Sequence, residues 1–232
     1  MASFLALPLG ALAVTVSDTT FADANWTLTV FPAGTGGAVV AGQSTVGLDF
    51  IRSVSDTVNL GPSLILGTHI YTPFTYNPAS SGPITTISYS ENAICLSGCF
   101  GQGQSTGIAL LQGGNLYVST VFLITGPSTS FHPVAASGLT AADFARVAVT
   151  ATSFFDNTLH PDFSASGAPI QFGFYRANSA GAGVNYTLVA GIDDFSLAIN
   201  PAPTTVPTLN PFAMGGLVLL LAVAGVLFLR RS

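Results

Sequence analysis

Residues 107–124 read GIALLQGGNLYVSTVFLI and set the fold class. Two runs rich in branched and aromatic residues flank the turn sequence Gln112-Gly-Gly-Asn115. Adjacent glycines supply the backbone conformations that a tight hairpin turn needs. This stretch therefore predicts two antiparallel strands joined by a hairpin.

The rest of the chain repeats this succession of strands and turns. Residues 26–30 (WTLTV) alternate apolar and polar side chains, as in a strand with one buried face. Thr140 and Asp143 have capping-box spacing, which predicts one helical turn. Further strands are predicted at 46–54, 65–74, 84–96, 107–111, 115–124, 147–155, 170–176 and 186–199. Residues 14–200 are therefore expected to form an all-β, antiparallel two-sheet sandwich of the jelly-roll type.

Charge is scarce, and this excludes several classes of function. Only 6% of the 232 residues are charged, with five arginines and no lysine, and the formal net charge is −5. Nucleic-acid binding is not expected, because no basic patch exists to neutralise phosphates. Lysine-dependent chemistry is excluded outright.

One long apolar stretch lies near the C-terminus. Residues 212–229, FAMGGLVLLLAVAGVLFL, would extend about 27 Å as a helix, close to the ~30 Å core of a bilayer. Arg230 and Arg231 follow at once, and positive flanking charge favours the cytoplasm. A transmembrane helix at 212–229 with a cytoplasmic basic end at 230–232 is predicted, and a buried core helix is the alternative.

A proline-rich linker at 201–211 precedes this span and contains Val206-Pro207-Thr208-Leu209. This motif, one apolar span and a terminal arginine pair, in that order, resemble the IPTL-CTERM sorting tail, a relative of the PEP-CTERM tail of Gram-negative surface proteins. Three motif residues match, and Val206 replaces the usual isoleucine. The resemblance implies sorting by an exosortase-like membrane protease that cuts near the motif.

The N-terminal residues 1–13, MASFLALPLGALA, are apolar and end in the small-x-small pattern of a signal-peptide cleavage site. They lack the basic region that begins a complete signal. A truncated signal peptide is the favoured interpretation, because a body outside the cytoplasm needs an export signal. A first β-strand is the alternative.

Five short motifs follow one another along residues 16–199. They are DTTF at 18–21 with Trp26, LTAADF at 139–144, PDF at 161–163, IQFGFYR at 170–176 and GIDDF at 191–195. Their order resembles bacterial ectodomains of the concanavalin/laminin-G-like jelly-roll type. The resemblance implies a curved antiparallel sandwich that binds glycans or acts as an adhesive module.

The two cysteines stand in Cys95-Leu-Ser-Gly-Cys99. Outside the cytoplasm such a pair favours a disulfide, and Ser97-Gly98 permits the tight turn. A metal site is the alternative, although two thiols alone do not make one.

Carboxylates near the first and last strands form a candidate calcium site. Asp18 lies near the opening strand, and Asp193 and Asp194 lie in the closing strand, which pairs with the opening strand in many jelly rolls. Oxygen ligands of this kind suit Ca²⁺. Without a bulge, only one of the two neighbouring aspartates can point inward. Structural Ca²⁺ is one hypothesis, and solvated or turn-capping carboxylates are the other.

Catalytic carboxylate pairs are scarce. Glycosidases place two carboxylates across the sugar bond, yet the single glutamate, Glu91, has no carboxylate within ten residues on either side. Asp156 with Asp162 is the pair that remains conceivable. The chain is therefore not expected to be an enzyme.

Aromatic residues are the remaining binding candidates. Tyr71 and Tyr76 lie in a proline-containing stretch, and Tyr175 stands beside Arg176. Sugar rings stack on exposed aromatic faces, so these three tyrosines are predicted glycan contacts. The alternative is that the rings belong to the core.

These features together predict an exported protein of the cell envelope, anchored in the membrane and then displayed on the surface or in an extracellular matrix. Its expected role is structural or adhesive. The alternative is a carbohydrate-binding module that recognises an extracellular polysaccharide.

Overall fold

A computed structural model describes residues 12–150 and 153–202 of the chain. The sorting motif at 206–209, the predicted span at 212–229, the basic end at 230–232 and most of the predicted signal peptide lie outside these residues. Within the described ranges, no helix is long and apolar enough to cross a membrane.

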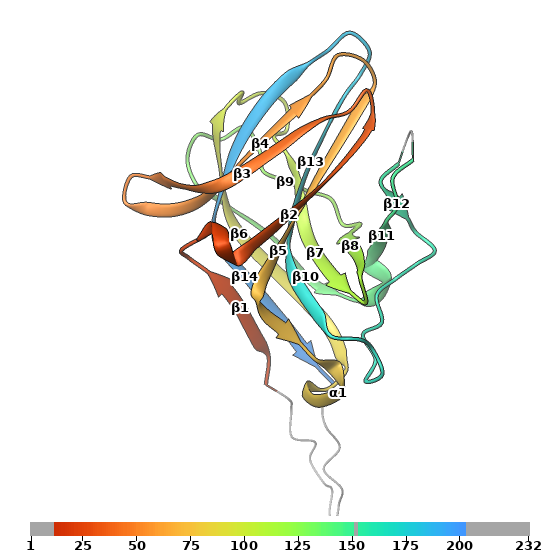
Figure 1. Cartoon of the computed structure of the whole chain (residues 1–232). Coiled ribbons are helices and arrows are strands. Elements are labelled where there is room, and N and C mark those ends of the chain that lie inside the picture. The colour runs from red at the N-terminus through yellow and green to blue at the C-terminus, as the bar shows by residue number, and fades with distance from the viewer. Residues whose placement is uncertain (1–11, 151–152, 203–232) are drawn as a thin grey trace, which may run out of the picture. The chain divides into compact units, whose positions relative to one another are not determined.

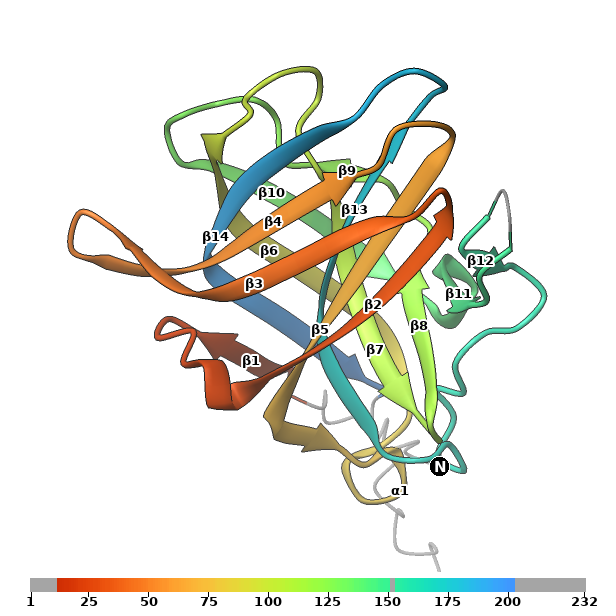
Figure 2. The ribbon, with the colours of Figure 1, turned by 45° about the horizontal axis from the view of Figure 1, so that its top comes forward.

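The described residues form two antiparallel sheets that pack face to face (Figures 1 and 2). The six-stranded sheet has the order β10-β6-β14-β4-β3, and β1 also pairs with β14. Its strands are β1 (Val14–Asp18), β3 (Gly37–Val46), β4 (Asp49–Val58), β6 (Ile84–Ser97), β10 (His132–Leu139) and β14 (Tyr186–Pro201). The predicted all-β, two-sheet sandwich is confirmed.

The eight-stranded sheet has the order β12-β11-β8-β7-β13-β5-β2, and β9 also pairs with β7. Its strands are β2 (Trp26–Gly34), β5 (Ser63–Tyr76), β7 (Ser105–Gln112), β8 (Asn115–Ser119), β9 (Leu123–Ile124), β11 (Phe144–Val147), β12 (Phe155–Asp156) and β13 (Ile170–Ala180). Short helical segments lie at η1 (Asp23–Asn25), α1 (Pro78–Ser81) and η2 (Ala141–Asp143).

Several local predictions are confirmed. Gln112 pairs with Asn115 across the hairpin between β7 and β8. The Asp143 carboxylate accepts hydrogen bonds from the Thr140 backbone N–H and hydroxyl at 2.8 and 2.9 Å, and η2 begins there. The first and last described strands, β1 and β14, pair from Val14–Ile199 to Asp18–Phe195, as predicted.

Three predicted strands are wrong as single elements. The chain turns at Gly47, with φ of +65°, so residues 46–54 divide between β3 and β4. The predicted strand 115–124 is interrupted after Ser119, because β8 and β9 both pair with β7 but in different registers. Residues 147–155 reverse direction, and Val147 of β11 faces Phe155 of β12.

The core between the sheets is centred on Trp26. Its ring lies 5.2–5.3 Å from the rings of Tyr71, Phe174 and Phe195, and its Nε1–H donates to the Asp18 carboxylate at 2.8 Å. These rings come from both sheets. The alternation at residues 26–30 therefore marks a core strand, as the sequence predicts.

A buried ion pair joins the sheets beside this aromatic cluster. Arg176 of β13 donates to the Glu91 carboxylate of β6 at 3.0 Å, and both side chains are fully buried. Tyr89 also donates to Glu91, and Arg176 also donates to Thr106. Removing one partner of such a pair leaves an uncompensated charge, which typically costs 3–5 kcal/mol.

Glu91→Gln is expected to lower the free energy of unfolding by about 3 kcal/mol or more, because the Arg176 charge then stays buried without a counter-charge. The double variant Glu91→Gln/Arg176→Met is expected to recover most of this loss. Arg146→Met is the control, because Arg146 and Asp156 form a half-exposed pair at 3.5 Å worth about 1 kcal/mol or less. Urea denaturation measures all three, and a Glu91→Gln loss no larger than the control contradicts the account.

Candidate functional site: a pocket on the eight-stranded sheet

A pocket of about 640 Å³ is lined mainly by the eight-stranded sheet and its loops, with Tyr186 of β14 from the other sheet. Along β13, Phe174 and Arg176 point between the sheets, so Tyr175 and Ala177 point to the opposite face. The lining residues are Leu64, Gln102, Gly103, Ser105, Phe122, Ile124, Ser153, Phe154, Phe155, Tyr175, Ala177, Asn178, Ser179 and Tyr186. They come from six separate stretches of sequence.

A second apolar cluster forms the base of this pocket. Leu66 of β5, Ala109 of β7 and Val118 of β8 are fully buried in it. The lining residues Tyr175 and Phe154 belong to the same cluster. The pocket therefore has a fixed floor, which the packing of the sheet itself provides.

Aromatic side chains form the walls. Phe122 leaves 70% of its surface exposed, compared with 48% for both Phe50 and Phe100. On another side, the ring of Tyr186 meets the ring of Phe100 edge to face at 4.9 Å. The Tyr186 hydroxyl donates to the Ser179 carbonyl at 2.8 Å, which fixes the ring.

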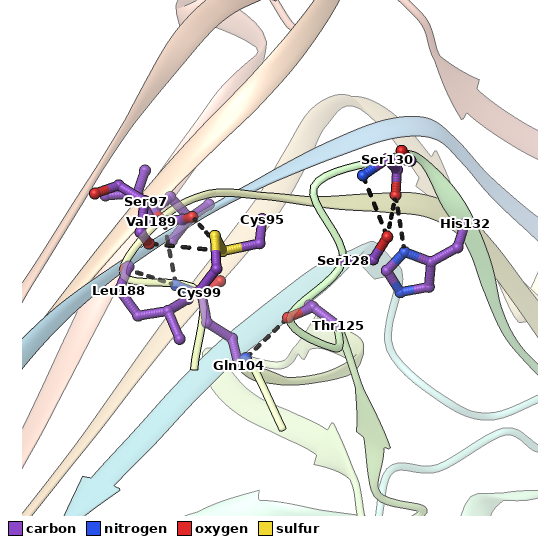
Figure 3. Close-up of a disulfide and its surroundings, with 11 residues drawn as sticks. Cys95, Ser97, Cys99, Gln104, Thr125, Ser128, Ser130, His132, Leu188 and Val189 are labelled. Atoms are coloured by element: carbon purple, nitrogen blue, oxygen red, sulfur yellow. Dashed lines mark hydrogen bonds between the residues drawn. A yellow bond between two sulfur atoms is a disulfide. The ribbon is translucent and has the colours of Figure 1, made fainter. Parts of the chain in front are cut away.

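The disulfide predicted between Cys95 and Cys99 is present, with a Cα–Cα distance of 5.7 Å. It closes the turn that leads from β6 to the pocket residues Gln102 and Gly103 (Figure 3). A Cβ at Gly98 would lie 2.3 Å from the Thr187 carbonyl oxygen, so this close approach to β14 requires glycine. The disulfide therefore holds one pocket wall against β14.

Gln104 anchors the other end of this loop inside the sandwich. Its side-chain amide donates to the Val54 and Leu188 carbonyls at 3.1 and 3.3 Å, and its backbone N–H donates to the Thr125 hydroxyl at 2.8 Å (Figure 3). The Gly126 N–H in turn donates to the Gln102 carbonyl at 3.0 Å. These bonds tie the loop to the segment that carries Ile124.

A buried carboxylate stands behind the polar part of the lining. Asn178 donates through Nδ2 to Asp56 of β4 at 3.1 Å. Burial raises the pKa of the Asp56 carboxyl to about 7, although the charge of Arg176 and the hydrogen bond from Asn178 lower it. Asp56 therefore changes charge near neutral pH, while it holds a lining side chain in place.

The three predicted glycan-stacking tyrosines do not come together. Tyr71 packs on Trp26 at the core, and Tyr76 is buried, with its hydroxyl donating to the Ser81 and Gly82 carbonyls. Tyr175 lines the pocket but is only 1% exposed, so it contributes to the floor and presents no open ring face. The prediction is therefore wrong for Tyr76 and Tyr175 as stacking platforms. Three other aromatic residues line the pocket and were not predicted as site residues: Phe122, Phe155 and Tyr186.

The predicted calcium ligands have other partners. Burial raises the pKa of Asp18, but hydrogen bonds from Thr20, Trp26 and Phe21 outweigh it and lower the pKa. Asp194, at a bulge with φ of +50°, accepts from Asn92 at 2.7 Å.

No group of three or more potential metal ligands occurs in the part of the chain that the structure describes. The Ca²⁺ hypothesis for Asp18, Asp193 and Asp194 stays a prediction.

The carboxylate pair Asp156 and Asp162 does not reach the pocket. Asp156 accepts from Thr158 and lies 3.5 Å from Arg146, and Asp162 accepts from the Ser164 N–H. Neither belongs to the pocket lining.

Ser105 stands in Gly103-Gln-Ser-Thr-Gly107, a Gly-x-Ser-x-Gly motif that the sequence interpretation missed. In serine hydrolases this motif forms a turn from a strand into a helix, with a histidine nearby. Here Ser105 begins β7, and no histidine lines the pocket. The motif therefore lacks its catalytic setting.

No protein family and no curated protein matches the sequence. Among solved structures, one from a study of carbohydrate-binding modules of the β-sandwich superfamily matches with a TM-score of 0.41 and 10% sequence identity. The match covers 77% of this chain. This chain spans 60% of the length of that structure.

Two family 22 carbohydrate-binding modules are also similar. One is described as a xylan-binding domain, at TM-score 0.34 and 12% identity over 81% of this chain and 95% of its own. The other comes from Clostridium thermocellum, at TM-score 0.34 and 11% identity over 81% and 94%. At these TM-scores and sequence identities, the similarity does not indicate which ligand this chain binds.

Asp56→Asn is expected to change how stability depends on pH. Because folding raises the pKa of Asp56 from 3.8 to about 7, the folded state binds a proton more tightly, and this contribution to stability is lost as pH rises through 7. The amide mimics the neutral acid, so the variant is expected to gain about 3 kcal/mol of stability relative to the parent on going from pH 5 to pH 8.

Urea denaturation at both pH values measures this difference, with the exposed Asp49→Asn as control. Equal effects of Asp56→Asn at the two pH values contradict the assignment.

Proposed function

We propose that the protein is a non-catalytic carbohydrate-binding module that holds a polysaccharide chain in the pocket of the eight-stranded sheet. The observation that carries this proposal is the lining, which combines aromatic rings with amide and hydroxyl groups. Sugar rings pack their C–H faces on aromatic rings, while amides and hydroxyls bond their hydroxyl groups. The volume of about 640 Å³ also falls within the range of small-ligand sites.

The chemistry of the lining supports a binding role rather than catalysis. No carboxylate and no histidine is among the lining residues, so neither a glycosidase pair nor a serine–histidine pair meets there. The buried cluster under the pocket, the disulfide and the Tyr186 hydrogen bond hold the lining in place before a ligand binds. Such preorganisation lowers the entropy cost of binding.

The proposal includes export and surface display through the sorting tail at 206–232. Tyr186, at the start of β14, lines the pocket, whereas β14 ends at Pro201 and pairs there with the start of β1. Both ends of the described chain thus emerge at the end of β14 away from the pocket (Figure 1). A tether that follows residue 202 would be attached at that end.

Within this proposal the sandwich is a jelly roll, the sorting enzyme is an exosortase-like protease, and the role is adhesive. A module fixed at one end and open at the other can attach a cell surface to a polysaccharide matrix.

Phe122→Ala is expected to weaken polysaccharide binding by about ten-fold or more, because one stacked ring contributes ~1.5 kcal/mol or more. Affinity electrophoresis of the full-length protein through polysaccharide-containing gels measures this. Phe50→Ala is the matched control, since Phe50 is 48% exposed on β4 and does not line the pocket. Equal retardation of both variants, or no retardation of the parent protein by any polysaccharide, contradicts the proposal.

Sorting has its own test in the mature C-terminus. Mass spectrometry of the surface-displayed protein is expected to find a new C-terminus near residues 206–209 and no Arg230 or Arg231. An intact Ser232 on the displayed protein contradicts processing by a sorting protease.

A further inference from the structure

The pocket contains no charge that could meet a charged ligand. All fourteen lining residues are uncharged. The described residues include three arginines against ten carboxylates, and each arginine already has an acidic partner. The pairs are Arg52–Asp23 at 3.0 Å, Arg146–Asp156 at 3.5 Å and Arg176–Glu91 at 3.0 Å.

Two lining residues adjoin carboxylates, which do not favour an acidic ligand. Asn178 donates to Asp56 at 3.1 Å, and Asp156, which follows Phe155, already pairs with Arg146 at 3.5 Å. Arg176 points the opposite way along β13, into the core toward Glu91. A carboxylate or sulfate in the pocket would lose its hydration and meet no cation in return.

An uncharged sugar chain encounters no such penalty. Its hydroxyl groups find polar partners at the exposed lining residues Gln102 and Ser179, and its apolar faces find Phe122 and Phe155. The excess of carboxylates over arginines also repels polyanions before they make contact.

We propose that the pocket is selective for uncharged polysaccharides and rejects uronate-containing, sulfated and phosphorylated ones. This inference rests on the proposed function and names the chemical class of its ligand.

The first experiment compares the full-length protein on neutral and acidic polymers, at low and at high salt. Neutral β-glucans, xylans and mannans are the first arm, and polygalacturonate and alginate are the second. Retention by at least one neutral polymer, unchanged by salt, with no retention by either acidic polymer, is the expected result.

Tighter retention by an acidic polymer than by every neutral one at low salt overturns the selectivity and leaves carbohydrate binding intact. No retention by any polymer overturns the proposed function itself, and the selectivity with it.

A gain-of-charge variant tests whether the pocket is the source of the selectivity. Gln102→Lys places a cation in the pocket wall, and Ser44→Lys places one on the exposed surface of β3, outside the pocket. Gln102→Lys is expected to gain binding to polygalacturonate by ten-fold or more at low salt and to lose that gain at high salt. An equal gain in Ser44→Lys, or no gain in Gln102→Lys, overturns the assignment to the pocket.

Discussion

The ion pair between Arg176 and Glu91 fixes how the two sheets meet. Both side chains are fully buried. The cost of burying each charge is offset because the opposite charge lies 3.0 Å away. Arg176 must therefore point inward, and the two-residue period of a strand then turns Tyr175 and Ala177 outward. The same constraint that holds the sandwich together also sets which residues of β13 form the pocket floor.

The parts of the fold that depend on neighbouring residues could be predicted from the sequence. The hairpin at 112–115, the capped turn at 140–143 and the disulfide between Cys95 and Cys99 each need only local geometry. The period-two pattern from Trp26 also identifies a core strand correctly. The strand β10 was not predicted, because its sequence HPVAASGL has few large apolar residues. Its hydrogen-bonded pairing with β6 holds it in the strand conformation.

The pocket could not be predicted in the same way, because its lining is assembled by the topology. Phe122 and Phe155 both fell inside predicted strands, where half of all side chains are expected to face a core. The break between β8 and β9 and the reversal between β11 and β12 interrupt those strands, and both residues line the pocket. Tyr71 and Tyr76 were predicted to be accessible because they lie in a proline-containing stretch. In the structure the Tyr71 ring packs on Trp26, and the Tyr76 hydroxyl donates to the carbonyls of residues 81 and 82. The composition predicts the charge of the pocket better than the motifs predict its residues. A chain with five arginines and no lysine has few cations that could contact a ligand.

The central claim is that a neutral polysaccharide occupies the pocket of the eight-stranded sheet. Hydrogen-exchange mass spectrometry, with and without a neutral oligosaccharide that binds, locates the ligand most directly. The account predicts slower exchange confined to the pocket lining, at residues 64, 102–105, 122–124, 153–155, 175–179 and 186. Protection confined instead to β3, β4 and β6 of the six-stranded sheet would contradict it.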